Sequence, residues 1–205
     1  LREVGQGWAV ALTTLAHERR LAAAARRPEP DRDGRLVLEA AAEWARAMEP
    51  YVWYPQRAGR ADLVTERAVA TGRHTDPLVR QEIAKLIALT WSAKWTAQRA
   101  AAARAIGRPP GPEGSLGKLA SSNIARAASG VHALIAGASG MLAGSDAPLD
   151  GIITEIFVSV PAVSIAGGTD EIQRKILGER ILGLPKEPLT DADQAFRHVP
   201  RNPQR

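Results

Sequence analysis

The chain has 205 residues, of which 45% are hydrophobic and 24% charged, and it carries a formal net charge of +5. This length and balance predict one globular domain with a real core and exclude a disordered tail. Cysteine is absent, which excludes a disulfide framework, a thiolate nucleophile and a cysteine zinc site, and the four histidines show no ligand spacing, so no metal site is expected.

Two further features bear on location and partners. The most apolar run, residues 152–166, contains Glu155 and Pro161 and is too short to cross a membrane. The first five residues resemble neither a signal peptide nor a transit peptide, so a cytoplasmic location is the default expectation. The positive charge is compatible with nucleic acid or an anionic substrate, but arginines spread among acids favour a solvated helix surface, and no nucleic-acid-binding motif is present.

The first third of the chain predicts helices interrupted by prolines. Apolar residues at three- and four-residue steps predict a long amphipathic helix that opens the chain and continues to about Arg27. Prolines and a glycine then stop it. Further helices are expected over 36–48 and 61–70.

Two long helices are expected next. Asp76 followed by Pro77 is typical of a helix start, with an N-cap and a proline at the first helical position, and this helix is expected to run to about Ile106. A loop rich in proline and glycine, 107–114, separates it from a helix predicted over 115–142.

A final helical pair and a tail complete the prediction. One helical segment is expected over 150–160, with a break at Pro161, and the last helix is expected over 169–182. No strand pattern is found. Long helices joined by short loops predict an all-α antiparallel bundle over residues 1–188, followed by an extended or disordered tail over 189–205.

The segment Gly167-Gly168-Thr169-Asp170-Glu171 is the first candidate for chemistry. It places a flexible turn at a helix N-terminus, where free N–H groups hold a phosphate or another electron-rich group. By itself the segment favours ordinary capping by Thr169, because the two acids would repel a phosphate.

The second candidate lies in the first helix. Glu18 falls at the edge of the apolar stripe, where partial desolvation raises a carboxylate pKa toward a value useful to a general base. A salt bridge on a solvated face is the simpler interpretation. Arg19 falls within the stripe, and a cation there requires a partner.

The run from Ser164 to Pro188, which contains the Gly167–Glu171 turn, closely resembles the C-terminal signature of acyl-CoA dehydrogenases. Residues 3–19 and 109–119 agree with the same family in the expected order. The resemblance spans nearly the whole chain to Pro188, and residues 26–75 match least.

The resemblance implies a C-terminal four-helix bundle that follows a helical N-terminal domain and a middle β-domain, with FAD between the β-domain and the bundle. The implied reaction removes the α-proton of an acyl-CoA thioester with a glutamate while the β-hydrogen leaves as hydride to the flavin, giving the trans-2-enoyl-CoA. The implied partners are acyl-CoA, an electron-transfer flavoprotein as electron acceptor, and other acyl-CoA dehydrogenase chains in a homo- or hetero-oligomer.

Site residues follow from the same resemblance. Many members place the base at the position of Gly167, so the common base is missing here. A subset carries it in a Leu-x-x-Glu-Arg pattern on the first bundle helix, which makes Glu18 the candidate base and Arg19 a candidate substrate-binding neighbour. Gly168, Thr169 and Glu171 stand where the family contacts the flavin nucleotide.

Departures from the family pattern keep two other functions open. An arginine segment that reaches a neighbouring subunit's flavin is replaced by 71–77, where Arg73 and Thr75 are possible substitutes. Arginines of related sequences are replaced by Ser159 and Pro161. Besides a catalytic half, the sequence is therefore compatible with a non-catalytic structural subunit or truncated remnant that mediates oligomer assembly. On net charge alone it is also compatible with a basic nucleic-acid-binding module.

Overall fold

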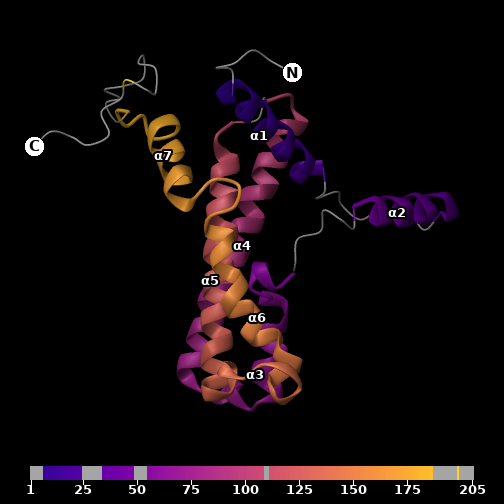
Figure 1. The fold of residues 1–205 in the computed structure, drawn as a ribbon, viewed down its shortest axis with the longest axis vertical. Coiled ribbons are helices and arrows are strands. Elements are labelled where there is room, and N and C mark those ends of the chain that lie inside the picture. The colour runs from indigo at the N-terminus through magenta and orange to yellow at the C-terminus, as the bar shows by residue number, and fades with distance from the viewer. Residues whose placement is uncertain (1–6, 25–33, 49–54, 109–110, 187–197, 199–205) are drawn as a thin grey trace, which may run out of the picture.

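The computed structural model describes residues 7–24, 34–48, 55–108, 111–186 and 198, and within these ranges all regular structure is helical. The prediction of an all-α fold is confirmed. Short 3-10 turns join seven described α-helices (Figure 1): α1 (Gly7–Ala24), α2 (Arg35–Met48), α3 (Val64–Ala70), α4 (Pro77–Ala105), α5 (Glu113–Ala136), α6 (Ile152–Ser159) and α7 (Asp170–Arg180).

The helices α4 and α5 form an antiparallel hairpin along the long axis of the molecule (Figure 1). Helix α3 packs against the base of this hairpin, and α6 returns beside α5 in the opposite direction. Helix α7 packs against α5 farther from the base, whereas α2 stands apart from the other helices. Helix α5 therefore contacts α3, α4, α6 and α7, and it is the central element of the fold.

Several helix boundaries agree with the sequence prediction. The Asp76 carboxylate accepts a hydrogen bond from the Leu78 N–H at 2.9 Å, which is the predicted N-cap of α4. Helix α6 ends at Ser159, and a 3-10 turn over Val160–Ser164 follows, so the predicted break at Pro161 is confirmed. The reason is that proline lacks the N–H that an α-helix requires.

Other boundaries differ. Helix α5 ends at Ala136 rather than near residue 142, because Gly137 adopts φ +54 and the chain continues as a 3-10 turn over Gly137–Met141. Helix α6 begins at Ile152 after Gly151 adopts φ +89, two residues later than predicted. The predicted tail, 189–205, lies outside the described residues except for position 198.

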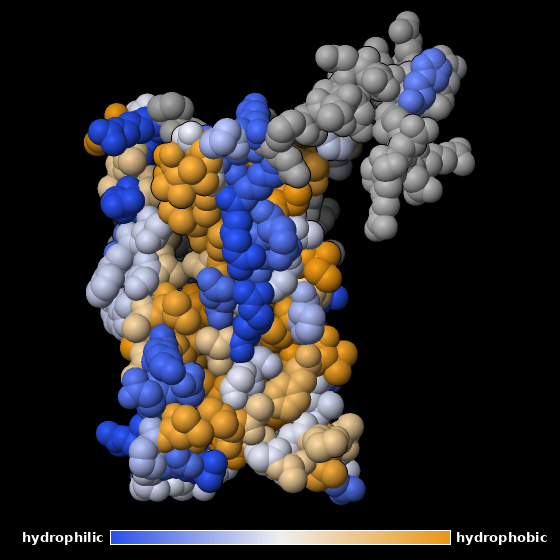
Figure 2. Space-filling view, turned by 90° about the vertical axis from the view of Figure 1, so that its left-hand side faces the viewer, coloured by the Kyte–Doolittle hydropathy of each residue, from blue (hydrophilic) through white to orange (hydrophobic). Residues whose placement is uncertain are grey.

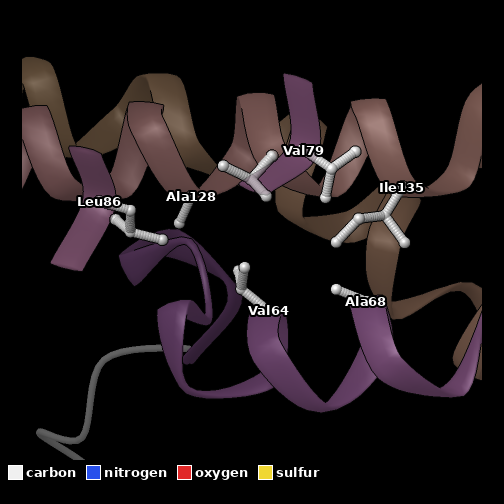
Figure 3. Packing of buried hydrophobic residues seen from close by; sticks show 7 residues of the cluster. Val64, Ala68, Val79, Leu86, Ala128 and Ile135 are labelled. Carbon is white, nitrogen blue, oxygen red and sulfur yellow. The ribbon is translucent and has the colours of Figure 1, made fainter. Parts of the chain in front are cut away.

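The core consists of two clusters on α5. Figure 3 shows the first cluster, where α3 and α4 pack against α5, and its buried members are Val64, Ala68, Val79, Leu86, Ala128, Val131 and Ile135. The second cluster joins α6 and the turn after it to α5 through Ala125, Ile153, Ile156 and Val160. Each fully buried valine or isoleucine contributes about 1.5–3 kcal/mol relative to the exposed side chain.

Helix α1 forms as predicted, but its apolar side chains stay exposed. Trp8, Leu12 and Leu15 are 74%, 50% and 40% exposed, and no described residue of α1 is buried. The buried residues of the described chain are Gly59 and residues of α3 to α7 and the turns between them. None of the described helices has the length and apolarity needed to cross a membrane.

A glycine before α3 allows a close approach between two backbones. Gly59 adopts φ +81, and a Cβ there would lie 2.5 Å from the carbonyl oxygen of Ala125 in α5. We expect Gly59→Ala to lower the free energy of unfolding by about 2 kcal/mol, because the added methyl group must displace backbone and the backbone angle is strained. Urea unfolding followed by far-UV circular dichroism measures this loss.

Gly72 provides a matched control for this substitution. It adopts φ +71, but a Cβ there would meet nothing within 4 Å. Gly72→Ala is therefore expected to cost only the backbone strain, about 1 kcal/mol. Equal losses in the two variants would contradict the close packing of Gly59 on α5.

Candidate functional site

The turn before α7 is built from two glycines and a capping threonine. Gly167 and Gly168 adopt φ +69 and φ +90, conformations that suit glycine. The Thr169 hydroxyl accepts a hydrogen bond from the Ile172 N–H at 3.3 Å, so the predicted capping is confirmed. The buried Gln173 side chain of α7 donates a hydrogen bond to the Gly167 carbonyl at 2.9 Å, which holds the turn against α7.

Asp170, the first residue of α7, clamps this turn onto α5. Its carboxylate is 2% exposed and forms ion pairs with Lys118 Nζ and Arg126 Nη1, each at 2.7 Å. Arg126 also donates to the Ser164 hydroxyl and, at 2.7 Å, to Asn123. The cluster therefore ties α7, the turn before it and α5 into one unit.

The electrostatics of this cluster determine the charge that the turn presents. Burial by itself raises the pKa of Asp170, but hydrogen bonds from Lys118, Arg126 and Ser122 outweigh it and hold the pKa well below its usual range. Asp170 is thus an anion with two cationic partners. Its negative charge is compensated inside the protein and does not repel a ligand at the turn.

Glu171 differs from its neighbour. Its carboxylate is exposed, and it pairs with Arg174 at 3.5 Å. Hydrogen bonds from its own backbone N–H and from the Thr169 side chain lower the pKa of Glu171. An exposed anion at this position suits a ligand group that donates hydrogen bonds, such as a hydroxyl or an N–H, better than a phosphate.

The structure brings together three of the five predicted site residues, because Gly168, Thr169 and Glu171 share the turn. A Cβ on Gly168 would lie 2.7 Å from the Gln173 side-chain nitrogen, so glycine is needed there. Glu18 and Arg19 belong to α1, but their side chains lie outside the described residues. The role of Glu18 as base and the role of Arg19 in substrate binding stay predictions.

Arg73, a possible substitute for the family arginine before the second bundle helix, contacts its own chain. Its guanidinium donates to the Leu134 carbonyl in the last turn of α5 at 3.2 Å, and it pairs with Asp76 at 3.2 Å. The Thr75 hydroxyl donates to the Gly72 carbonyl at 3.0 Å. These contacts give both side chains a structural role at the base of the hairpin.

Sequence reasoning missed the Asp170 cluster as a unit. Lys118, Ser122 and Arg126 follow one another at four-residue steps, which places three polar side chains on one face of α5. This spacing was the available signal, because a polar row on a central helix requires a polar partner. The acid that supplies the partner is 44 residues away from Arg126 along the chain.

A second buried polar pair lies at the base of the hairpin. His132 is fully buried, and its Nδ1 accepts a hydrogen bond from Arg67 Nη1 at 2.8 Å while its Nε2 donates to the Arg60 carbonyl at 3.1 Å. Burial lowers the pKa of His132, and the charge of Arg67 lowers it further. The neutral imidazole therefore serves as a structural link between α3 and α5.

Comparison with known proteins decides the family. The family model for the C-terminal domain of acyl-CoA dehydrogenases matches residues 58–182, more than half of the chain. The chain belongs to the acyl-CoA dehydrogenase family. The matched segment begins next to Gly59 and includes the turn before α7 and nearly all of the core.

One curated relative and one similar solved structure of this acyl-CoA dehydrogenase domain come from Mycobacterium tuberculosis. The chain is 28% identical over 192 residues to acyl-CoA dehydrogenase IpdE1, and the match covers 89% of the chain and 40% of that protein. Among solved structures, a chain of the ChsE4–ChsE5 complex superposes with a TM-score of 0.48 at 24% identity, over 55% of this chain and 29% of the other. The chain thus spans less than half the length of the curated relative that it matches.

Proposed function

We propose that the chain is the C-terminal half of an FAD-dependent acyl-CoA dehydrogenase that converts an acyl-CoA thioester to the trans-2-enoyl-CoA. Family membership supports the reaction class, and the turn before α7 supports a nucleotide site. Completion of the active site requires the N-terminal and middle domains that the family possesses. Its further partners are an electron-transfer flavoprotein and other chains of the family.

The residues of the turn fit the proposed cofactor. Gly167 and Gly168 present backbone without side chains, and the ion pairs of Asp170 compensate its charge, which leaves Glu171 as the exposed acid of this helix N-terminus. Gly168 and Thr169 would hold the cofactor through backbone groups, and Glu171 would accept hydrogen bonds from it. When bound, FAD supplies the acceptor for a hydride from the substrate.

The chemical role of this chain's own residues is proton removal and orientation. In the proposal, the Glu18 carboxylate accepts the α-proton of the thioester, while the β-hydrogen departs with its electron pair and a carbon–carbon double bond forms. Arg19 orients Glu18 or the acyl-CoA beside it. The absence of a carboxylate at Gly167 supports Glu18, because the reaction still requires a base.

The experiment is the visible absorption spectrum of the chain co-expressed with an acyl-CoA dehydrogenase chain that supplies the N-terminal and middle domains, followed by titration with acyl-CoA. We expect a flavin band that bleaches when acyl-CoA is added. In Glu18→Gln we expect the rate of bleaching to fall by about 100-fold or more. Glu43→Gln in α2 is the matched control and is expected to bleach as the wild type does. Bleaching at the wild-type rate in Glu18→Gln would refute the role of Glu18.

A non-catalytic structural subunit is the second candidate function. The specific observation in its favour is that the Arg73 guanidinium donates to the Leu134 carbonyl and pairs with Asp76, so it already has partners within its own chain. This function predicts that the co-expressed preparation contains no flavin although the chain is folded.

A further inference from the structure

The outer face of α4 carries a regular row of side chains that no described element covers. Pro77, Gln81, Ala84, Ala88, Trp91 and Trp95 follow one another at alternating steps of four and three residues, the spacing by which one helix meets another along a seam. We call these six residues the α4 seam. It lies opposite Val79 and Leu86, the side chains with which α4 enters the core.

Two shallow, open hollows lie along the α4 seam. An open hollow of about 680 Å³ is lined by Thr75, Pro77, Arg80, Gln81 and Ala84. A second of about 350 Å³ is lined by Ala88, Trp91, Ser92 and Trp95. The two indoles are 45% and 60% exposed, and their ring centroids are 5.6 Å apart. Large aromatic side chains beside such hollows are typical anchors of a protein interface.

Other parts of the surface show why this row stands out. On the face drawn in Figure 2, hydrophobic patches reach the surface along the length of the molecule on both sides of a hydrophilic band. Scattered apolar residues of this kind are normal on a protein surface. A row with helical seam spacing, two adjacent indoles and two hollows on one helix is more specific than scattered exposure.

The charges that border the α4 seam indicate the occupant. Its borders carry four exposed cations: Arg80, Lys85, Lys94 and Arg99. Lys94 is held at the seam because its ammonium lies 4.5 Å from the centroid of the Trp91 ring. The sole acid of α4 is Glu82, which is paired with Lys85 at 2.6 Å. The exposed apolar side chains of Leu78 and Ile87 share these borders with the cations. The seam is therefore an apolar row whose borders carry a net positive charge.

This charge pattern disfavours a second copy of α4. In the antiparallel register that sets Pro77 and Gln81 of one copy against Trp95 and Trp91 of the other, the border residues Arg80 and Lys94 face each other, and Lys85 faces its own copy. Like charges in these positions repel. A partner with acidic borders instead meets opposite charge on both sides of the row.

We propose that the α4 seam binds an amphipathic helix of a different polypeptide, whose apolar face is bordered by aspartate and glutamate. The indoles of Trp91 and Trp95 anchor its apolar face, and the four border cations select its charge. This inference concerns assembly and is independent of the dehydrogenase reaction, so a chain without flavin still tests it.

The test uses two fluorescein-labelled helical peptides of about three heptads, identical in their leucine and alanine seam and bordered by glutamate in one and by lysine in the other. Fluorescence anisotropy measures binding to the full chain at about 50 mM and 300 mM salt. We expect the glutamate peptide to bind roughly ten-fold more tightly than the lysine peptide, with a preference that weakens as salt rises. The double variant Lys85→Glu/Lys94→Glu is expected to abolish the preference, because the two introduced acids offset the remaining cations Arg80 and Arg99.

A pair of variants separates the seam from the rest of α4. Trp91→Ala/Trp95→Ala is expected to lower the affinity for the glutamate peptide by roughly ten-fold or more, because two anchoring side chains are removed. The matched control is Leu89→Ala, which removes an exposed side chain of the same helix outside the seam. It is expected to leave the affinity for the glutamate peptide unchanged. Both side-chain sets are exposed, so far-UV circular dichroism is expected to show intact folding.

Three outcomes would overturn the proposal. Equal affinity for the two peptides, or no binding of either, would show that the border cations do not select an acidic helix. Light scattering that shows a dimer dissociated by Trp91→Ala/Trp95→Ala would make a second copy the occupant. Displacement of the glutamate peptide by a short DNA duplex, with the same dependence on the two tryptophans, would assign the seam to nucleic acid.

Discussion

Replacing Asp170 by alanine is expected to lower the free energy of unfolding by about 2–4 kcal/mol. The substitution leaves Lys118 and Arg126 without their carboxylate in a cluster where Lys118 is only 17% exposed. The expected loss lies below that of a fully buried pair because the Arg126 side chain is 43% exposed and gains solvation from water. Chemical denaturation of the purified chain measures the loss.

The matched control for Asp170 is Asp146→Ala. Asp146 is an exposed aspartate in the turns between α5 and α6, and a change of less than about 0.5 kcal/mol in the free energy of unfolding is expected there.

The pH dependence of stability provides a second test of Asp170. The folded pKa of Asp170 is lowered, so its stabilisation is present above the unfolded pKa of about 3.9 and is lost as the pH falls below it. Asp170→Asn is expected to remove this part of the acid-induced loss.

Replacing His132 by alanine is expected to lower the free energy of unfolding by about 3–4 kcal/mol. The ring is fully buried, so its removal leaves a cavity between α3 and α5, and it also removes the acceptor for the buried Arg67 guanidinium. His74→Ala is the matched control, because His74 is exposed before α4 and is expected to tolerate the change. Equal losses in both variants would show that the buried pair contributes nothing.

His132 also predicts how stability responds to mild acid. Burial is the main cause that lowers its folded pKa, the hydrogen bond to the Arg60 carbonyl opposes this, and the charge of Arg67 adds to it. In the unfolded chain the His132 imidazole binds a proton at about pH 6.5, whereas in the folded protein it binds one only at lower pH. This stabilisation is present above that pH and declines as the pH falls below it. His132→Gln is expected to show a smaller decline between about pH 7 and pH 5 in thermal unfolding.

The local rules of the sequence predicted the helices well where one strong signal acts alone. The proline at Pro77, the cap at Asp76 and the break at Pro161 all act through a single backbone group, so a few neighbouring residues determine the outcome. The end of α5 was less predictable. The apolar pattern continues past Gly137, whereas this glycine adopts φ +54 and the chain leaves the α-helix there.

The candidate site was predictable in part for the same reason. Gly168, Thr169 and Glu171 are consecutive or nearly so, and one turn brings them together. The Asp170 cluster was predictable on one side only: the four-residue spacing on α5 indicates a polar row, but no local pattern indicates that α7 meets it at Lys118 and Arg126. The exposure of Trp8 and Leu12 was also unexpected, since periodicity identifies an apolar face but not the surface that covers it.

The unequal burial along α4 implies that one helix has two levels of local stability. Its buried side chains, Val79 and Leu86, both lie in its first half. Beyond them α4 has no buried residue, and its least exposed positions include the half-buried Ala93, Ala100 and Ala103. Amide hydrogens of the first half should exchange with deuterium only when the whole domain unfolds. Amide hydrogens of the second half should exchange through local opening, orders of magnitude faster. The C-terminal half of α4 can therefore unfold locally while the N-terminal half stays folded.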